Sequence, residues 1–457
     1  MGASARDTAV RALLNRSGRV AEQLDRAAEE GQLGPHDAAL ARELALGCVR
    51  RWLAIDAVLR AFLDKPNKRP HAVIGKILWV ALYQILYLAR VPDFAAVSEA
   101  VEQTGRFGHK RQGGFVNAVL RTILRNVSEL IRGQVPLAPD VVPVGPKAYR
   151  RVQRAVFPDP AADPAGYLAA AMSIPYVLAR RWIEQFGSLS AAMKPAEHAN
   201  VRAPLIVRVN HRKADVESAV ASIEADGVGA QPHSNGQSIV LGRQRRLTEL
   251  AAFIEGWIQP QDPSATAVVA AAEAQPGMKV LDLCAAPGTK TTHLAEMMDD
   301  SGSITAVDSP EKLQKIEANC RRLGLTIVKT HPADQLPQLL AGSFDLVLAD
   351  VPCTNTGVLA RRAEARWRFN DERLRKLVKD QQFLLAAGER FVKPGGRLIY
   401  STCSLEPEEC GRLVERFSAK QSRVELVSEA LSMPAGADDP CRWYDGGYVA
   451  IFVAGSR

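Results

Sequence analysis

The sequence lacks the cysteine pattern of a disulfide framework or a zinc site. Its seven cysteines are an odd number, and no two of them form a CxxC pair. It also lacks a segment that could span a bilayer, because the longest apolar run, Ile77 to Ala89, has 13 residues and contains Gln84. The N-terminal residues contain no apolar signal-peptide core. These absences predict a cytoplasmic protein without a metal site or a membrane segment.

Two phosphate-binding signatures are missing from Lys279 to Lys290, a segment typical of a strand, a tight turn and a helix start. A dinucleotide fingerprint needs three glycines, and this segment contains only Gly288. A P-loop needs a glycine directly before its lysine, and Thr289 occupies that position. The segment is therefore unsuited to a ligand that is bound through its phosphates.

An acidic residue follows the next expected strand where nucleotide folds bind a ribose. Asp308 stands 20 residues after Gly288, and a carboxylate at about that spacing accepts hydrogen bonds from ribose hydroxyls in βαβ folds. A ribose-binding acid without a phosphate-binding loop favours S-adenosylmethionine, which carries no phosphate. An ordinary strand-turn-helix unit without a ligand is the alternative for these residues taken alone.

The positive charge of this 457-residue chain, which is +8 in total, is concentrated ahead of that segment. Residues 1–133 carry 20 Lys and Arg against 13 Asp and Glu, whereas residues 261–457 carry 24 against 26. A basic front end on a neutral module predicts binding of a polyanion, with nucleic acid as the leading candidate. A solvated arginine-rich surface would give the same counts.

Periodicity predicts three parts ahead of residue 261. Residues 1–132 are expected to be helical, with a central buried helix over 77–88 and Asp37 as an N-cap. Residues 133–165 are expected to form an extended linker, because seven of the 27 prolines lie within 133–164. Residues 166–260 are expected to form a small α/β module, with a helical stretch over 167–186 and strands at 205–210, 239–241 and 253–254.

From residue 261 the pattern alternates between strands and helices, which predicts a mostly parallel sheet covered on both faces. Ligands bind at the carboxyl ends of the strands in such a fold. The expected strands are 278–283, 303–307, 326–330, 344–349, 397–401 and 447–453, and the expected helices are 290–299, 310–323, 371–391 and 406–418.

Two cysteines follow expected strands at that edge of the sheet. One lies in Asp350-Val351-Pro352-Cys353 and the other in Ser401-Thr402-Cys403-Ser404. Inert core thiols are the alternative, since free cysteine is commonly buried. Two thiols beside Asp350 instead favour methylation at C5 of a pyrimidine. In that reaction a thiolate adds to C6, an acid near N3 stabilises the adduct, and a base removes the C5 proton.

The N-terminal helices resemble the RNA-binding domain of the antitermination factor NusB. The similar stretches are Leu82–Leu88, Val97–Glu102 and Phe115–Arg121. Within them, Ser98 is expected to cap a helix and Asn117 to tie helices together. The resemblance implies contact with RNA and identifies no catalytic residue.

The C-terminal motifs are similar to those of RNA (cytosine-5)-methyltransferases: Gln261–Ser264, Asp282–Gly288, Asp350–Cys353, Ser401–Ser404 and Asp445–Tyr448. Together with the NusB-like domain, they make nearly the whole chain resemble the bacterial 16S rRNA cytosine-5 methyltransferases of the Fmu/Sun type. The resemblance implies a multidomain chain with an all-α NusB-like bundle (1–132), a Pro-rich linker (133–165), a small α/β RNA-binding module (166–260) and a Rossmann-like methyltransferase domain (261–457).

The same resemblance implies roles for individual residues. Cys403 would be the nucleophile and Cys353 the thiol that assists release, while Asp350 would contact the base near the cofactor. The S-adenosyl-L-methionine site would comprise Cys284, Ala285, Ala286, Pro287, Gly288, Thr289, Lys290, Asp308, Asp334 and Asp350. DNA cytosine-5 enzymes use the Pro-Cys thiol as nucleophile, so the choice of Cys403 follows the RNA branch.

Three positions depart from the family pattern. Thr289 replaces a second glycine, Asn355 stands where a small residue is common, and Asp334 does not follow a glycine. The adenine contact expected of Asp334 rests on the weakest match.

The function expected from the sequence is methyl transfer to C5 of a cytosine in 16S rRNA through a covalent Cys–C6 adduct. The expected partner is rRNA, in a precursor of the small subunit, and the expected state is a monomer. The alternatives are a tRNA cytosine-5 methyltransferase and a non-catalytic RNA-binding or ribosome assembly factor. The joint presence of Asp308, Asp350, Cys353 and Cys403 favours catalysis.

Overall fold

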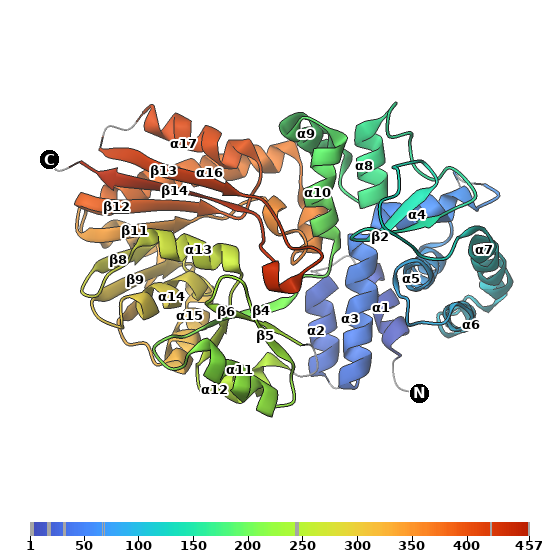
Figure 1. Cartoon of the computed structure of the whole chain (residues 1–457), viewed down its shortest axis with the longest axis horizontal. Coiled ribbons are helices and arrows are strands. Elements are labelled where there is room, and N and C mark those ends of the chain that lie inside the picture. The colour runs from blue at the N-terminus through green and yellow to red at the C-terminus, as the bar shows by residue number, and fades with distance from the viewer. Residues whose placement is uncertain are drawn as a thin grey trace. The chain divides into compact units, whose positions relative to one another are not determined.

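A computed structural model gives the fold of the chain (Figure 1) and describes residues 4–15, 20–30, 33–65, 67, 69–242, 246–420 and 423–455. The chain divides into two compact units, one formed by Met1–Val201 with Arg362–Arg368 and the other by Arg202–Arg361 with Phe369–Arg457. Within the described ranges, no helix combines the length and the apolar character that a membrane span requires.

The first unit begins with the expected helices, centred on α5 (Ala72–Tyr87). Ten residues of α5 are buried, which confirms the predicted central helix. A Cβ atom at Gly47 would stand 2.0 Å from the Tyr83 ring, so glycine is what lets α3 pack this closely on α5. The other helices here are α1 (Ala5–Leu14), α2 (Val20–Glu29), α3 (Pro35–Arg50), α4 (Trp52–Ala61), α6 (Asp93–Arg106) and α7 (Gly113–Asn126).

Three local expectations for these helices are wrong. Helix α3 begins at Pro35 with Gly34 as its N-cap, so Asp37 lies in the first turn instead. Ser98 lies inside α6, which begins directly after Pro92. Asn117 lies on α7, where its side chain accepts a hydrogen bond from Arg121 of the same helix.

The segment expected to be a linker is folded. Strands β1 (Ile131–Arg132) and β2 (Val141–Gly145) each pair with β3 (Ala148–Arg151) in an antiparallel sheet of order β1-β3-β2. Pro143 fits because β2 is an edge strand, where a missing backbone donor is tolerated. The unit continues with α8 (Pro164–Met172), α9 (Tyr176–Phe186) and α10 (Leu189–Asn200), so the helical stretch over 167–186 is two helices.

The second unit begins with a four-stranded antiparallel sheet of order β5-β6-β4-β7. Its strands are β4 (Leu205–Val209), β5 (Ala230–Pro232), β6 (Ser238–Leu241) and β7 (Ile258–Pro260), accompanied by α11 (Val216–Ala225) and α12 (Ala251–Ile254). Phe253 and Ile254, expected in a strand, lie in α12. An apolar pair is too short for its periodicity to distinguish a strand from a helix.

The larger sheet of this unit has seven strands in the order β10-β9-β8-β11-β12-β14-β13. The five from β10 to β12 are parallel, and only β14 among the seven runs in the opposite direction, antiparallel to its neighbours β12 and β13, which confirms the mostly parallel sheet. The strands are β8 (Lys279–Asp282), β9 (Ser303–Asp308), β10 (Val328–Pro332), β11 (Phe344–Asp350), β12 (Val392–Thr402), β13 (Val424–Ser432) and β14 (Gly447–Ala454). Strand β13 was not expected, because nearly all of its side chains are exposed and show no alternation.

Helices cover both faces of this sheet, as Figure 1 shows, with α13 (Pro263–Ala272), α14 (Thr289–Met297) and α15 (Pro310–Leu323) on one face. The other face carries α16 (Asp371–Phe391) and α17 (Gly411–Ser418). The chain runs from β8 outward to β9 and β10, and then returns to β11 and β12 on the other side of β8. Ligands bind at such a reversal of strand order, so the edge beside β8 and β11 is where a site is expected.

Candidate active site

The turn after β8 carries the residues predicted to bind a cofactor. Gly288 is the N-cap of α14 and has a φ of 96°, a left-handed conformation that favours glycine. Asp282 accepts a hydrogen bond from Thr291 at 2.7 Å, and burial raises its pKa to about 7. Burial also raises the pKa of the Cys284 thiol, which keeps it protonated at neutral pH. Asp282 and Thr291 thus fix this turn to the helix that follows.

Asp308, at the end of β9, lies against the same turn. Its carboxylate accepts hydrogen bonds from the backbone of Ala286 at 3.0 Å and of Ser309 at 2.7 Å, and from Lys312 Nζ at 2.9 Å. Burial works against the charged form, but the hydrogen bonds from Lys312 and from the backbone lower the pKa of Asp308 below its ordinary value. The structure therefore places a charged acceptor beside the turn.

Asp334 is less closely associated with the turn. It lies exposed in a 3-10 turn (η3, Ala333–Gln338) that follows β10. Strand β10 is two strands away from β8, although its carboxyl end belongs to the same edge of the sheet.

Asp350, the last residue of β11, contacts one residue of β12 and one residue of the helix that follows β8. Lys290 Nζ, from the first turn of α14, donates to Asp350 Oδ2 at 2.6 Å, and Ser401 Oγ donates to Oδ1 at 2.7 Å. Burial disfavours the lysine charge, but the Asp350 carboxylate raises the pKa of Lys290 above its ordinary value. The sequence assigned both residues to the site but did not predict that they form an ion pair.

The two thiols meet at this edge although they are 50 residues apart. Cys353 Sγ and Cys403 Sγ are 3.0 Å apart, and both cysteines are free. Cys353 is buried and Cys403 is partly exposed. The hydrogen bond to Cys403, together with burial, raises the pKa of Cys353 well above its ordinary value. The Cys353 thiol is therefore protonated at neutral pH.

Asn355, an unusual residue at its position, suits the local backbone. Its φ is 64°, a left-handed conformation that asparagine tolerates better than most residues. Its side chain donates to the carbonyl of Cys353 at 2.7 Å and accepts from Cys403 Sγ at 3.4 Å. Asn355 therefore touches both cysteines.

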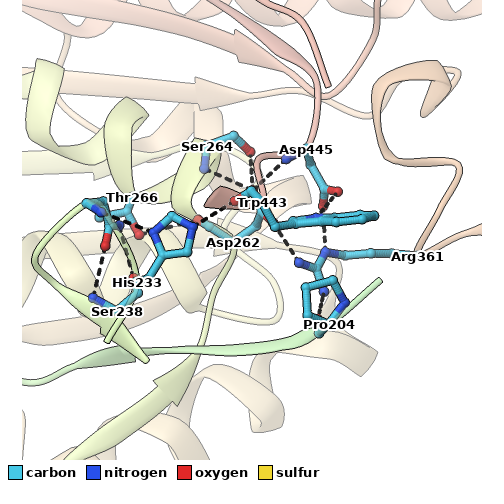
Figure 2. Close-up of polar contacts among 10 residues, drawn as sticks. Pro204, His233, Ser238, Asp262, Ser264, Thr266, Arg361, Trp443 and Asp445 are labelled. Atoms are coloured by element: carbon cyan, nitrogen blue, oxygen red, sulfur yellow. Dashed lines mark hydrogen bonds and ion pairs between the residues drawn. The ribbon is translucent and has the colours of Figure 1, made fainter. Parts of the chain in front are cut away.

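Arg361 lies at the far end of the loop that begins at Cys353, and Figure 2 shows the polar contacts of its guanidinium group. Arg361 donates to Asp262 Oδ2 and to Asp445 Oδ2, each at 2.6 Å, and to the carbonyl of Pro204 at 2.8 Å. Trp443 Nε1 donates to the other oxygen of Asp445 at 3.1 Å. Two motifs that the sequence flagged only by resemblance, Gln261–Ser264 and Asp445–Tyr448, thus converge on one guanidinium group.

Models of three known families match separate parts of the chain. A model of the family described as 16S rRNA methyltransferase RsmB/F matches residues 269–440. The NusB family model matches residues 3–125, and the ferredoxin-like domain of the RsmF/B-like methyltransferases matches residues 174–248. The last match identifies the small α/β module as ferredoxin-like.

Curated relatives match over most of their length. The chain is 30% identical to the probable ribosomal RNA small subunit methyltransferase B of Bacillus subtilis, over 85% of this chain and 81% of the relative. It is 32% identical to the protein of the same name from Synechocystis, over 86% and 83%. A solved methyltransferase homologue from Pyrococcus horikoshii has a TM-score of 0.53 and 26% identity, and the match covers 63% of this chain and 97% of that one.

Proposed function

The chain belongs to the family of ribosomal RNA small subunit methyltransferase B, and we propose that it methylates C5 of a cytosine in 16S rRNA through a covalent adduct. The observation that carries the proposal is the pair of thiols 3.0 Å apart beside Asp350. Methylation at a ring nitrogen or a ribose hydroxyl needs no thiol, whereas C5 becomes nucleophilic only after addition at C6.

The residues around the first turn fit S-adenosylmethionine. The charged Asp308 suits the ribose hydroxyls, and the turn from Cys284 to Lys290 would enclose the rest of the nucleoside. Asp350 would contribute a second carboxylate, and Asp334 would lie toward the adenine. When bound, the cofactor supplies the methyl group.

We assign the nucleophile to Cys403. The thiolate is the reactive form of cysteine, and Cys353 is both buried and held protonated. Cys403, partly exposed, attacks C6 of the cytosine. The proton that the Cys403 thiol loses passes through solvent to Asp350, which Lys290 and Ser401 orient. The O–H so formed donates a hydrogen bond to N3, where negative charge develops as the adduct forms.

Release of the product reverses the addition. Water accepts the C5 proton, the C5–H electron pair forms the C5=C6 double bond, and the Sγ–C6 pair returns to Cys403. The Cys353 S–H group donates a hydrogen bond to the sulfur as negative charge develops on it. This step assigns different tasks to two thiols that the sequence presents in similar settings.

The test is incubation of the purified chain, as a monomer, with 16S rRNA and methyl-labelled S-adenosylmethionine in the presence of a reductant. We expect 5-methylcytosine at one position, and loss of that mark from the rRNA of cells that lack the protein. Labelling of tRNA alone would support the tRNA alternative. Cofactor binding without any methyl transfer would support a non-catalytic assembly factor.

A further inference from the structure

Buried hydroxyl groups tie together the two loops that carry the thiols. Thr354 directly follows Cys353, and Ser404 directly follows Cys403. Their hydroxyl oxygens are 3.1 Å apart, and both residues are buried. The Thr356 hydroxyl is also 3.1 Å from that of Ser404. The relative position of the two cysteines is therefore set by the residues that follow them.

A fully buried carboxylate completes this cluster. Glu409 lies in a 3-10 turn (η6, Pro407–Glu409) after β12, with 0% of its surface exposed. Its Oε1 atom accepts hydrogen bonds from the backbone of Thr354 at 3.0 Å and from Gln381 Nε2 at 2.8 Å. Its Oε2 atom accepts a short hydrogen bond from the Thr354 hydroxyl. Three donors thus converge on one buried side chain.

The cluster holds the peptide on both sides of Cys353. Gln381, on α16, donates to the carbonyl of Pro352 at 2.9 Å as well as to Glu409. Glu409 accepts from the amide of Thr354, and the Tyr400 hydroxyl donates to the backbone carbonyl of Glu409 at 2.7 Å. Strand β12 and helix α16 therefore fix the loop that carries the Pro-Cys thiol.

Stability alone does not explain this arrangement. Burying a carboxylate costs free energy even when it is well hydrogen-bonded, and apolar residues of similar volume often serve a core equally well. What a buried polar cluster can supply is a unique geometry, provided that its members are satisfied. The geometry that this cluster defines is that of the two thiols.

We propose that Glu409 is a positioning residue that holds the Cys353 thiol against Cys403, so that Cys353 serves release of the product. This inference rests on the proposed two-thiol mechanism. Glu409 contacts Thr354, which follows Cys353, directly. It reaches Ser404, which follows the nucleophile Cys403, only through the Thr354 hydroxyl, so adduct formation depends on Glu409 less than release does.

The test compares Glu409→Ala with Glu409→Gln and with the neighbouring Glu408→Ala, whose carboxylate pairs with the exposed Arg412 instead. Each variant is incubated with 16S rRNA and S-adenosylmethionine under reducing conditions. Three quantities are measured: the rate of adduct formation in a single turnover, the fraction of adduct on a denaturing gel, and steady-state methylation. Thermal melting checks the fold.

Glu409→Ala is expected to lower steady-state turnover roughly tenfold or more, the effect of losing a hydrogen bond to a charged group. Adduct formation should stay within about threefold of wild type, so the adduct accumulates. Glu409→Gln keeps one acceptor oxygen, and its new amide can donate to the Thr354 hydroxyl, so it should restore most of the turnover. Glu408→Ala should match wild type.

If Glu409→Ala does not fold, Thr354→Val tests the same positioning role. Thr354→Val is nearly isosteric and removes only the hydroxyl that joins Glu409 and Ser404, and it should also accumulate adduct. Equal losses of adduct formation and release, or release at the wild-type rate in both variants, would overturn the positioning role. Absence of adduct and of methylation in the wild-type protein would instead refute the proposed function.

Discussion

The carboxyl edge of the large sheet has two different halves. The half formed by the ends of β8 and β9 presents the charged Asp308 near solvent. The half formed by the ends of β11 and β12 holds two thiols among mostly buried hydroxyl groups. Asp308 pairs with Lys312, whose side chain is 54% exposed. Cys353 is held by residues such as Thr354 and Glu409 that are 5% exposed or less. The first half of the edge is suited to binding a polar cofactor, and the second to holding reacting atoms in one geometry.

The largest expected effect lies in the buried half. Cys403→Ala should lower the rate of methyl transfer by ~10³-fold or more, as removal of a nucleophile commonly does. Cofactor affinity should be unchanged, because the turn after β8 does not depend on that thiol. Labelled-methyl incorporation measures transfer, and calorimetry measures cofactor affinity. Methyl transfer at the wild-type rate would contradict the assignment of the reacting thiol to the β11–β12 half of the edge.

The next effect concerns Lys290, which joins the two halves through Asp350. Lys290→Met should reduce turnover roughly 10- to 100-fold, because a hydrogen bond between charged groups is removed. Cofactor affinity should fall as well, since Lys290 belongs to the turn. The exposed Lys315→Met, on α15, is the matched control. A change in turnover without a change in cofactor affinity, or the reverse, would show that Lys290 serves only one half of the edge.

Within the cofactor half, Asp308→Ala should weaken S-adenosylmethionine binding by roughly 1.5–3 kcal/mol, the contribution of a charge-assisted hydrogen bond. At saturating cofactor, turnover should approach that of wild type. Calorimetry measures the affinity, with the exposed Glu311→Ala as control. Undiminished affinity in a folded Asp308 variant would remove this residue from the site.

The smallest effect on catalysis is expected outside the edge. Removing the first 132 residues is not a clean test of RNA capture, because the compact unit continues to Val201. Alanine should instead replace four exposed basic residues of the α7 region: Lys110, Arg111, Arg121 and Arg125. RNA binding should weaken, and the slope of log K against log salt should fall by about 0.7 for each RNA phosphate that the variant no longer neutralises.

The control for this charge removal replaces four exposed basic residues on α16, in the neutral part of the chain: Arg373, Arg375, Lys376 and Lys379. Turnover at saturating RNA should be unchanged in both variants. Equal binding by the α7 variant and wild type at every salt concentration would refute RNA capture by the helical domain.

Much of this edge is predictable from the sequence because parallel strands end at a common edge. That rule alone brings Cys353, Cys403 and Asp350 together, since Asp350 and Ser401 are paired in the register of β11 and β12. It also places Asp308 beside the turn after β8. The prediction of individual strands fails where burial does not alternate, as in the exposed β13, and where a proline lies on an edge strand, as in β2.

The supporting contacts are not predictable in this way. Arg361 joins Asp262 to Asp445, which are 183 residues apart, and nothing in either local pattern indicates that they share a partner. Glu409 lies in the acidic stretch Glu406 to Glu409, and such a run of charge in a sequence is typical of an exposed surface. Its side chain is nevertheless fully buried. Such contacts depend on the packing of distant segments and become visible only in three dimensions.

The most direct test of the account is a denaturing gel of Cys353→Ala and Cys403→Ala after incubation with 16S rRNA and S-adenosylmethionine. We predict that Cys353→Ala accumulates a protein–RNA species resistant to denaturant, because the nucleophile remains while release fails. We predict no such species for Cys403→Ala. An adduct with Cys403→Ala and none with Cys353→Ala would contradict the assignment and make the Pro-Cys thiol the nucleophile.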